Sequence, residues 1–202
     1  MFFNQQSGVS SPIDLIPRGQ LAWAMVTFRG MKASQSGGEY ADLELTLADN
    51  QPNARRKIFT KIGNPDHQGN SDGYRQMGMT SLTRMVEAAS IVNPEDPNSY
   101  EKLNGMSCED VCRLLDGKYV AIKVKIEPGK DGYDDKNDVG DFLTPNKQSQ
   151  SNKNFLKLCS GDFNLNANPA AARTASSGFG TSNVASAPQA QRPQGTGFGH
   201  QH

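Results

Sequence analysis

The stretch QLAWAMVTFRGM, residues 20–31, predicts a long first strand because it is rich in apolar and aromatic residues. Pro17 and Gly19 precede it, and both residue types interrupt regular structure. Gly30 marks a position where such a strand can kink. A long first strand that bends can serve both halves of a small barrel, so the length of this segment bears directly on the fold class.

Two alternating segments follow the first one. Residues 40–47 place Ala41, Leu43, Leu45 and Leu47 on one side of a predicted strand. Residues 55–62 place Ile58, Thr60 and Ile62 on one side and Arg55, Lys57, Phe59 and Lys61 on the other. The three consecutive strands predict a meander.

The period of the apolar residues then changes to that of a helix. Over residues 74–89 the apolar positions are Tyr74, Met77, Leu82, Met85, Val86 and Ala89. Gly78 lies inside this helix and costs up to about 1 kcal/mol relative to alanine, which packing must offset. A short second helix is expected at residues 108–115, ended by Gly117.

Residues 118–127 alternate again and predict a fourth strand, and the fifth is expected at 139–143, at 154–158, or at both. Three strands, a helix and two strands are the order of an OB-fold, a mainly β, five-stranded Greek-key barrel with a helix between strands three and four. The same order suits an open α+β sheet. The length of the first strand favours the barrel.

Composition divides the chain into three parts. In residues 164–202 the only charged residues are Arg173 and Arg192, and most others are Ala, Ser, Gly, Asn, Gln, Thr or Pro. Such a segment buries too little apolar surface to order itself. We therefore expect a flexible arm at 1–17, a folded domain with the OB-fold order at 18–163, and a disordered Gly/Ser/Ala/Gln-rich tail at 164–202.

Charge and cysteine content argue against several classes of protein. The chain has 21 basic and 21 acidic residues, so polyanion binding requires a local basic patch. Three cysteines without framework spacing predict a reduced, cytoplasmic protein, and no apolar run reaches the ~18 residues of a membrane span. Cys108 and Cys112 lack further ligand partners, and the acidic loop 131–141 departs from the calcium-loop pattern. We expect no metal, no cofactor and no enzymatic activity.

The predicted third strand is the candidate nucleic-acid-binding site. Its cations can bind phosphates, and the aromatic ring beside them can stack on a base. In an alternative, Lys57 and Lys61 pair across strands with Asp42 and Glu44 as an ordinary solvated face. Trp23 and Phe28 lie on opposite faces by parity, so at most one of them can stack on a base. The nucleic-acid-binding candidates are Arg55, Arg56, Lys57, Phe59, Lys61, Trp23, Tyr40, Lys123 and Lys125.

Several short motifs resemble a phage family of small OB-fold proteins that are often catalogued as domains of unknown function. They are Gly19, Lys32, Gly37-Gly38-Glu39-Tyr40 before LELTL, Arg56 with Ile58-Phe59, the helix end at 82–88, and Asn137-Asp138-Val139 before Phe142. The resemblance covers residues 18–145. It implies a single-stranded-DNA-binding protein encoded beside phage replication or recombination genes. Unlike many single-strand binders, the chain has a tail without any acidic residue.

The sequence thus predicts a sequence-tolerant binder that protects and presents single-stranded DNA during phage replication or recombination in the host cytoplasm. Its expected partners are single-stranded DNA, replication or recombination proteins, and further copies of itself. One alternative is a structural or adaptor protein that binds protein partners through its OB-like domain and tail. Another is a binder of RNA or oligosaccharide.

Overall fold

The computed structural model describes residues 14–130 and 132–163. In this part of the chain the strands, α1 and α2 follow the predicted order, whereas η1 and α3 are helices that the sequence did not predict. The elements are β1 (Leu21–Ala33), β2 (Glu39–Leu47), β3 (Lys57–Gly63), α1 (Asp72–Ala88), the 3-10 helix η1 (Pro97–Leu103), α2 (Cys108–Leu115), β4 (Tyr119–Glu127), β5 (Lys136–Leu143) and α3 (Asn152–Cys159).

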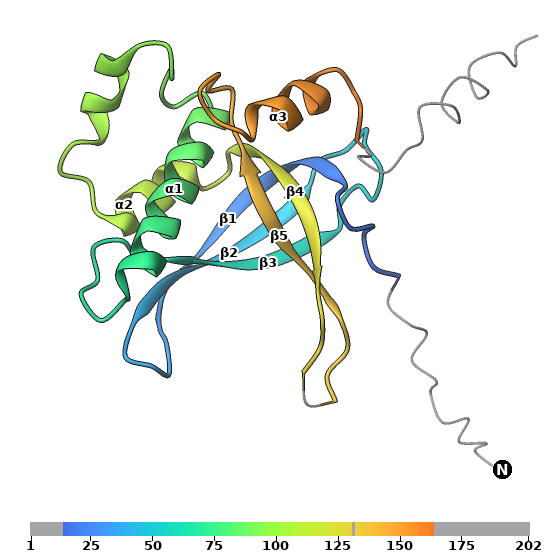
Figure 1. Cartoon of the computed structure of the whole chain (residues 1–202), viewed down its shortest axis with the longest axis horizontal. Helices are drawn as coiled ribbons and strands as arrows, with labels where there is room; N and C mark the ends of the chain where they lie inside the picture. Colours follow the sequence, from blue (N-terminus) through green and yellow to red (C-terminus); the bar gives the residue numbers. More distant parts are fainter. Residues whose placement is uncertain (1–13, 131, 164–202) are drawn as a thin grey trace, which may run out of the picture. The chain divides into compact units, whose positions relative to one another are not determined.

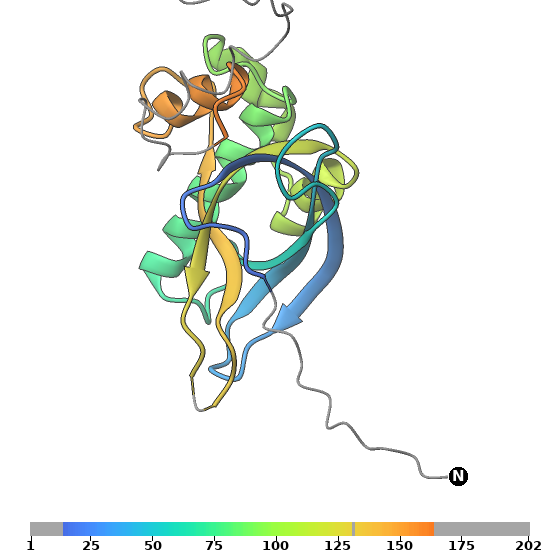
Figure 2. The same ribbon diagram turned by 90° about the vertical axis from the view of Figure 1, so that its right-hand side faces the viewer.

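The strands form one antiparallel sheet in the order β3-β2-β1-β4-β5. The sheet is strongly curled, with β1 and β2 on one side and β4 and β5 on the other (Figures 1 and 2). It is an open sheet, because no ladder joins the edge strands β3 and β5 within the described residues. The fold is therefore mainly β, with α1 following β3, and the sheet is not closed into the predicted barrel.

β1 holds the sheet together because it pairs with β2 along one edge and with β4 along the other. The ladder to β2 shifts register between Phe28 and Met31. Gly30 sits inside this irregularity with φ of 104°, a conformation that L-residues with a side chain rarely adopt. The kink predicted at Gly30 is confirmed as a bulge.

Alternation along the strands builds the main core inside the curl. Leu43, Leu45, Ile58 and Ile122 are buried there, and Met85 of α1 packs against them. α2 adds the free thiols Cys108 and Cys112, both buried. The hydrogen bond with Cys108, together with burial, raises the pKa of the Cys112 thiol. α2 has the predicted bounds because Ser107 and Asp110 form a capping box at its start.

A second, smaller cluster lies beneath α3. Leu21, Ala121 and Leu143 of the sheet are buried against Leu158, with Trp23 and Phe155 packed beside them. The prediction of a strand at 154–158 is wrong, because these residues form part of the helix α3. Phe155 and Leu158 are three residues apart, a spacing that brings both to one face of a helix. The alternative at 139–143 falls within the longer strand β5.

The ordered fold begins before residue 18. Ile16 is buried in the main core. Its backbone N–H donates to Asn137 Oδ1 at 2.8 Å, and its carbonyl accepts from Asn137 Nδ2 at 2.9 Å. Residues 14–17 are assigned from sequence to the flexible arm, but Ile16 among them is held against β5. The rest of that arm and the predicted tail lie outside the described residues.

A buried carboxylate ties the helices to the end of the sheet. Glu87 of α1 is only 2% exposed. It accepts hydrogen bonds from the Tyr100 hydroxyl of η1 at 2.5 Å, from the Thr144 hydroxyl, and from Asn146 Nδ2 at 3.2 Å. Burial and the Glu87 carboxylate raise the pKa of Tyr100. Within the described residues, none of the helices has the length and apolarity needed to cross a membrane.

α1 crosses β3 at very close range. A Cβ on Gly78 would lie 1.9 Å from the Gly63 carbonyl oxygen, and a Cβ on Gly63 would lie 2.7 Å from the Tyr74 ring. The helical glycine that the sequence marks as costly is thus required by the packing of α1 on the sheet.

We expect Gly78→Ala to lower the free energy of unfolding by about 1–3 kcal/mol, because the clash with β3 outweighs the better helix propensity of alanine. Gly73→Ala is the matched control in the same helix, since a Cβ there meets no atom within 4 Å. It should raise stability by up to about 1 kcal/mol. Urea titration followed by circular dichroism measures both; equal stabilisation by the two variants would contradict the close α1–β3 contact.

Candidate nucleic-acid interface

The predicted alternation of β3 is confirmed. Lys57, Phe59 and Lys61 are exposed, whereas Ile58, Thr60 and Ile62 between them are buried. Phe59 is 51% exposed, a large value for an aromatic side chain in a strand. The outward face of β3 therefore carries an accessible ring between two cations.

The register of β2 on β3 places carboxylates beside this row. Glu44 lies opposite Phe59 and Asp42 lies opposite Lys61. The Lys57 ammonium is 2.7 Å from Glu44 Oε1, so the alternative of an ordinary cross-strand ion pair is correct for Lys57. Lys61 instead lies over the Tyr40 ring, with Nζ 4.6 Å from the ring centroid. Asp42 does not pair with Lys61.

Asp42 organises two further cations that the sequence reasoning missed. It is 7% exposed, and its Oδ2 lies 2.5 Å from Lys32 Nζ and 3.7 Å from an Arg29 guanidinium nitrogen. Arg29 in turn lies over the Phe59 ring, 5.1 Å from its centroid. Parity along β1 could have suggested Arg29, but its position over Phe59 depends on the bulge at Gly30.

Arg55 departs from the predicted row. β3 begins at Lys57, and Arg55 lies in the preceding turn with φ of 62°. Its Nε is 2.8 Å from Asp49 Oδ1, and this hydrogen bond and charge raise the pKa of Arg55. Its neighbour Arg56 donates a long hydrogen bond of 3.4 Å to Asn53 Oδ1 and lines the groove described next.

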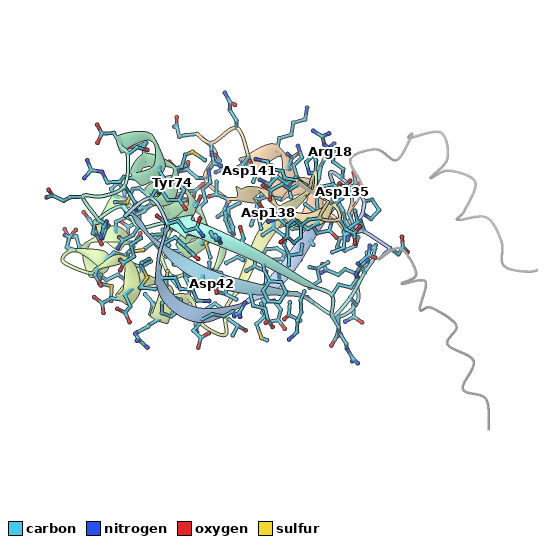
Figure 3. The ribbon with its side chains drawn as sticks, turned by 90° about the horizontal axis from the view of Figure 1, so that it is seen from below. Arg18, Asp42, Tyr74, Asp135, Asp138 and Asp141 are labelled. Carbon is cyan, nitrogen blue, oxygen red and sulfur yellow. The ribbon has the colours of Figure 1, made fainter. Side chains whose placement is uncertain are left out.

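A groove of about 600 Å³ runs between the outward face of β3 and the β4–β5 hairpin. In Figure 3, β3 runs between Asp42 on one side and Asp135 and Asp138 on the other. One wall is cationic and aromatic, whereas the other is acidic. The first wall contains Arg56, Lys57, Phe59, Lys61 and Tyr74, with the Asp42 carboxylate beside them, and the second contains Glu127, Asp135, Asp138 and Lys136.

Neighbouring lysines partly neutralise the acidic wall. Lys125 Nζ is 3.1 Å from Asp138 Oδ2, and Lys136 Nζ is 3.3 Å from Glu127 Oε2. Lys123 lies opposite Asp141 in the ladder. Burial raises the pKa of Asp141, although Arg84 and Lys123 oppose the shift. The predicted candidates Lys123 and Lys125 therefore face carboxylates of β5 and do not extend the basic row.

Tyr74 is an aromatic member of the groove that the sequence assigned only to the apolar face of a helix. Its ring packs against Gly63 at the end of β3. Burial, and then the neighbouring Tyr40, raise the pKa of Tyr74. Tyr40, Phe59 and Tyr74 thus place three aromatic rings along or beside the basic wall.

Trp23 lies elsewhere on the sheet. Its ring meets Phe155 of α3 edge to face, with centroids 5.7 Å apart and an interplanar angle of 78°. Phe28 packs against the other, main core cluster, as the parity argument predicts. Trp23 is absent from the described lining of the groove. Of the two further aromatic candidates, Tyr40 adjoins the basic row, whereas Trp23 is half-buried against Phe155 of α3.

Within the described ranges, no group of three or more His, Cys, Asp or Glu side chains is placed to hold a metal ion. Comparison of the chain with protein-family models and with curated proteins found no match. The functional argument therefore rests on the groove itself.

The placement of Trp23 predicts a spectroscopic result, because it is the only tryptophan of the chain. Phe155→Ala should uncover its indole and shift the fluorescence emission to longer wavelength. Phe59→Ala, which removes a ring from the other site, should leave the emission maximum unchanged. Emission spectra of the native variants provide the measurement, and an unchanged maximum in Phe155→Ala would contradict the packing of Trp23 beneath α3.

Proposed function

We propose that the protein is a sequence-tolerant binder of single-stranded DNA whose site is the groove beside β3. The observation that carries the proposal is the half-exposed Phe59, flanked by Lys57 and Lys61 on the groove wall. A ring can stack on any base, and cations beside it can meet the phosphates of the same strand. The Arg29 guanidinium lies over this ring, 5.1 Å from its centroid, and the ring still remains half exposed.

We also propose that the open sheet is an OB-fold. The order β3-β2-β1-β4-β5 is that of an OB barrel opened between β3 and β5. These two edge strands contact each other, and α1 packs on β3, β4 and β5. The hairpin loops β1–β2 and β4–β5 project to the same side in Figure 1. OB-folds bind oligonucleotides with the face of strands 2 and 3 and with these two loops, and the groove is lined by residues of β3 and of the β4–β5 hairpin.

The two walls of the groove would contribute differently to binding. Lys61 has no carboxylate partner within ion-pair distance in the described residues, so its charge is available to a phosphate. Arg56 is bound only weakly to Asn53 and extends the same wall. Phe59 and Tyr40 offer stacking surfaces. The opposing carboxylates favour one strand along the basic wall over a duplex, because a second phosphate backbone would approach the acidic wall.

In this role the protein coats unpaired strands and leaves them open to a polymerase or a recombinase. The resemblance to the phage family of small OB-fold proteins suggests the setting, phage DNA replication or recombination. Binding should weaken as salt rises, because phosphate contacts release counterions.

Phe59→Ala should weaken binding to oligo-dT about five- to hundredfold, the effect of losing one stacked base. Tyr119→Ala is the matched control, because Tyr119 is 50% exposed on β4 and does not line the groove. Fluorescence anisotropy of a labelled oligo-dT, with duplex DNA and single-stranded RNA as competitors, measures the effect. Equal losses in both variants, or no binding by the unaltered protein at low salt, would refute the proposed site.

Two charge substitutions should act in opposite directions. Lys61→Ala removes a phosphate contact and should reduce the slope of log affinity against log salt by about 0.7, the increment for one contact to a single strand. Glu44→Gln releases Lys57 and should raise both affinity and slope by a comparable increment.

The control for these charge variants is Glu109→Gln, which breaks the Glu109–Arg113 pair on α2 away from the groove. It should leave the salt slope unchanged. Slopes that follow only the net charge, with Glu109→Gln equal to Glu44→Gln, would show that the lysines of β3 make no specific contact.

A further inference from the structure

A second concave site lies on the helical side of the protein and shares no lining residue with the groove. It is formed by α1, η1, α2 and the loop after β3, and its volume is about 130 Å³. Small-molecule sites usually enclose at least about 300 Å³, so this pocket is too small for a cofactor and matches a single large side chain. Its apolar walls are provided by Met79, Leu82, Val86, Leu103, Met106 and Val111.

The rim of this pocket is unusually rich in exposed methionine. Met79 is 48% exposed and Met106 is 39% exposed, although both line the pocket. Methionine is flexible and polarizable, and surfaces built from it adapt to the side chains of a partner. Exposed apolar surface around a hollow marks an interaction site more often than isolated exposed residues do.

The charge of the surrounding segment indicates the chemistry of the partner. Residues 93–116 contain six acidic and two basic side chains, a net charge of −4. Glu95 is paired with Lys147 and Glu109 with Arg113, while Glu101 and Asp110 are exposed without an ion pair to a described residue. Hydrogen bonds from Ser107 lower the pKa of Asp110, which keeps this carboxylate ionised. The acidic surface repels nucleic acid and attracts a cationic peptide.

We propose that the α1–η1–α2 pocket is a docking site for a cationic segment of a partner protein, anchored by one large aliphatic or aromatic side chain. The apolar hollow binds the anchor, and the acidic rim binds the lysines or arginines beside it. Because the pocket and the groove use different residues, a partner can bind here while the groove is occupied. This surface gives the protein a recruitment route that needs no acidic tail.

Methyl NMR of the full chain labelled at methionine tests the proposal. The probe is a short amphipathic peptide of lysine and leucine. The Met79 and Met106 signals should shift saturably, whereas Met85 in the core and Met25 and Met31 on β1 should not. Two matched peptides, with glutamate for lysine or alanine for leucine, should each bind at least about tenfold more weakly.

Met106→Lys should weaken the lysine–leucine peptide at least about tenfold, since it replaces a pocket wall by a cation. Met77→Lys is its control, because Met77 is 68% exposed on α1 and does not line the pocket, and it adds the same charge. An unshifted Met85 signal verifies the fold of both variants. No shift at Met79 and Met106 with millimolar peptide, equal binding of the glutamate peptide, or equal loss in both variants would overturn the proposal.

Discussion

The pairing of β1 with two different strands is the constraint on which the rest of the structure depends. Its ladder to β4 runs from Leu21 to Met25, and its ladder to β2 continues to Ala33 beyond the bulge at Gly30. This double pairing joins the β2–β3 hairpin and the β4–β5 hairpin into one curled sheet (Figure 2). The curl brings the basic wall of β3 and the acidic wall of β5 to opposite sides of one groove.

Much of this fold was predictable, because a strand with one buried face has apolar and polar residues in strict alternation. β2, β4 and the outward row from Lys57 to Lys61 follow from that pattern alone, and α1 follows from the helical period. Residues 154–158 were misassigned because a short apolar run is compatible with either period. Because these residues form a helix and not the expected strand, the ring of Phe155 packs against Trp23.

The candidate site is less predictable than the fold, since it depends on contacts between residues far apart in the chain. The alternation along β3 predicts that Phe59 lies on the outward face. The pairing of Lys57 with Glu44, and the position of Lys61 beside Tyr40, depend on the register of β2 on β3 and cannot be predicted from the alternation. β3 begins only at Lys57, and Arg55 lies in the turn before it, so Arg55 does not belong to the outward row. The facing carboxylates, such as Asp138, come from a hairpin almost eighty residues away and have no local signature.

The central claim is that single-stranded DNA lies in the groove beside β3. Photocrosslinking to an oligonucleotide that carries 5-iodo-deoxyuridine, followed by peptide mass spectrometry, tests it most directly. The geometry predicts crosslinks at Phe59, Tyr40 or Tyr74, and none at Tyr119 or Trp23. Crosslinks concentrated on α3 or at Tyr119, with β3 unmodified, would contradict the claim and place the nucleic acid elsewhere.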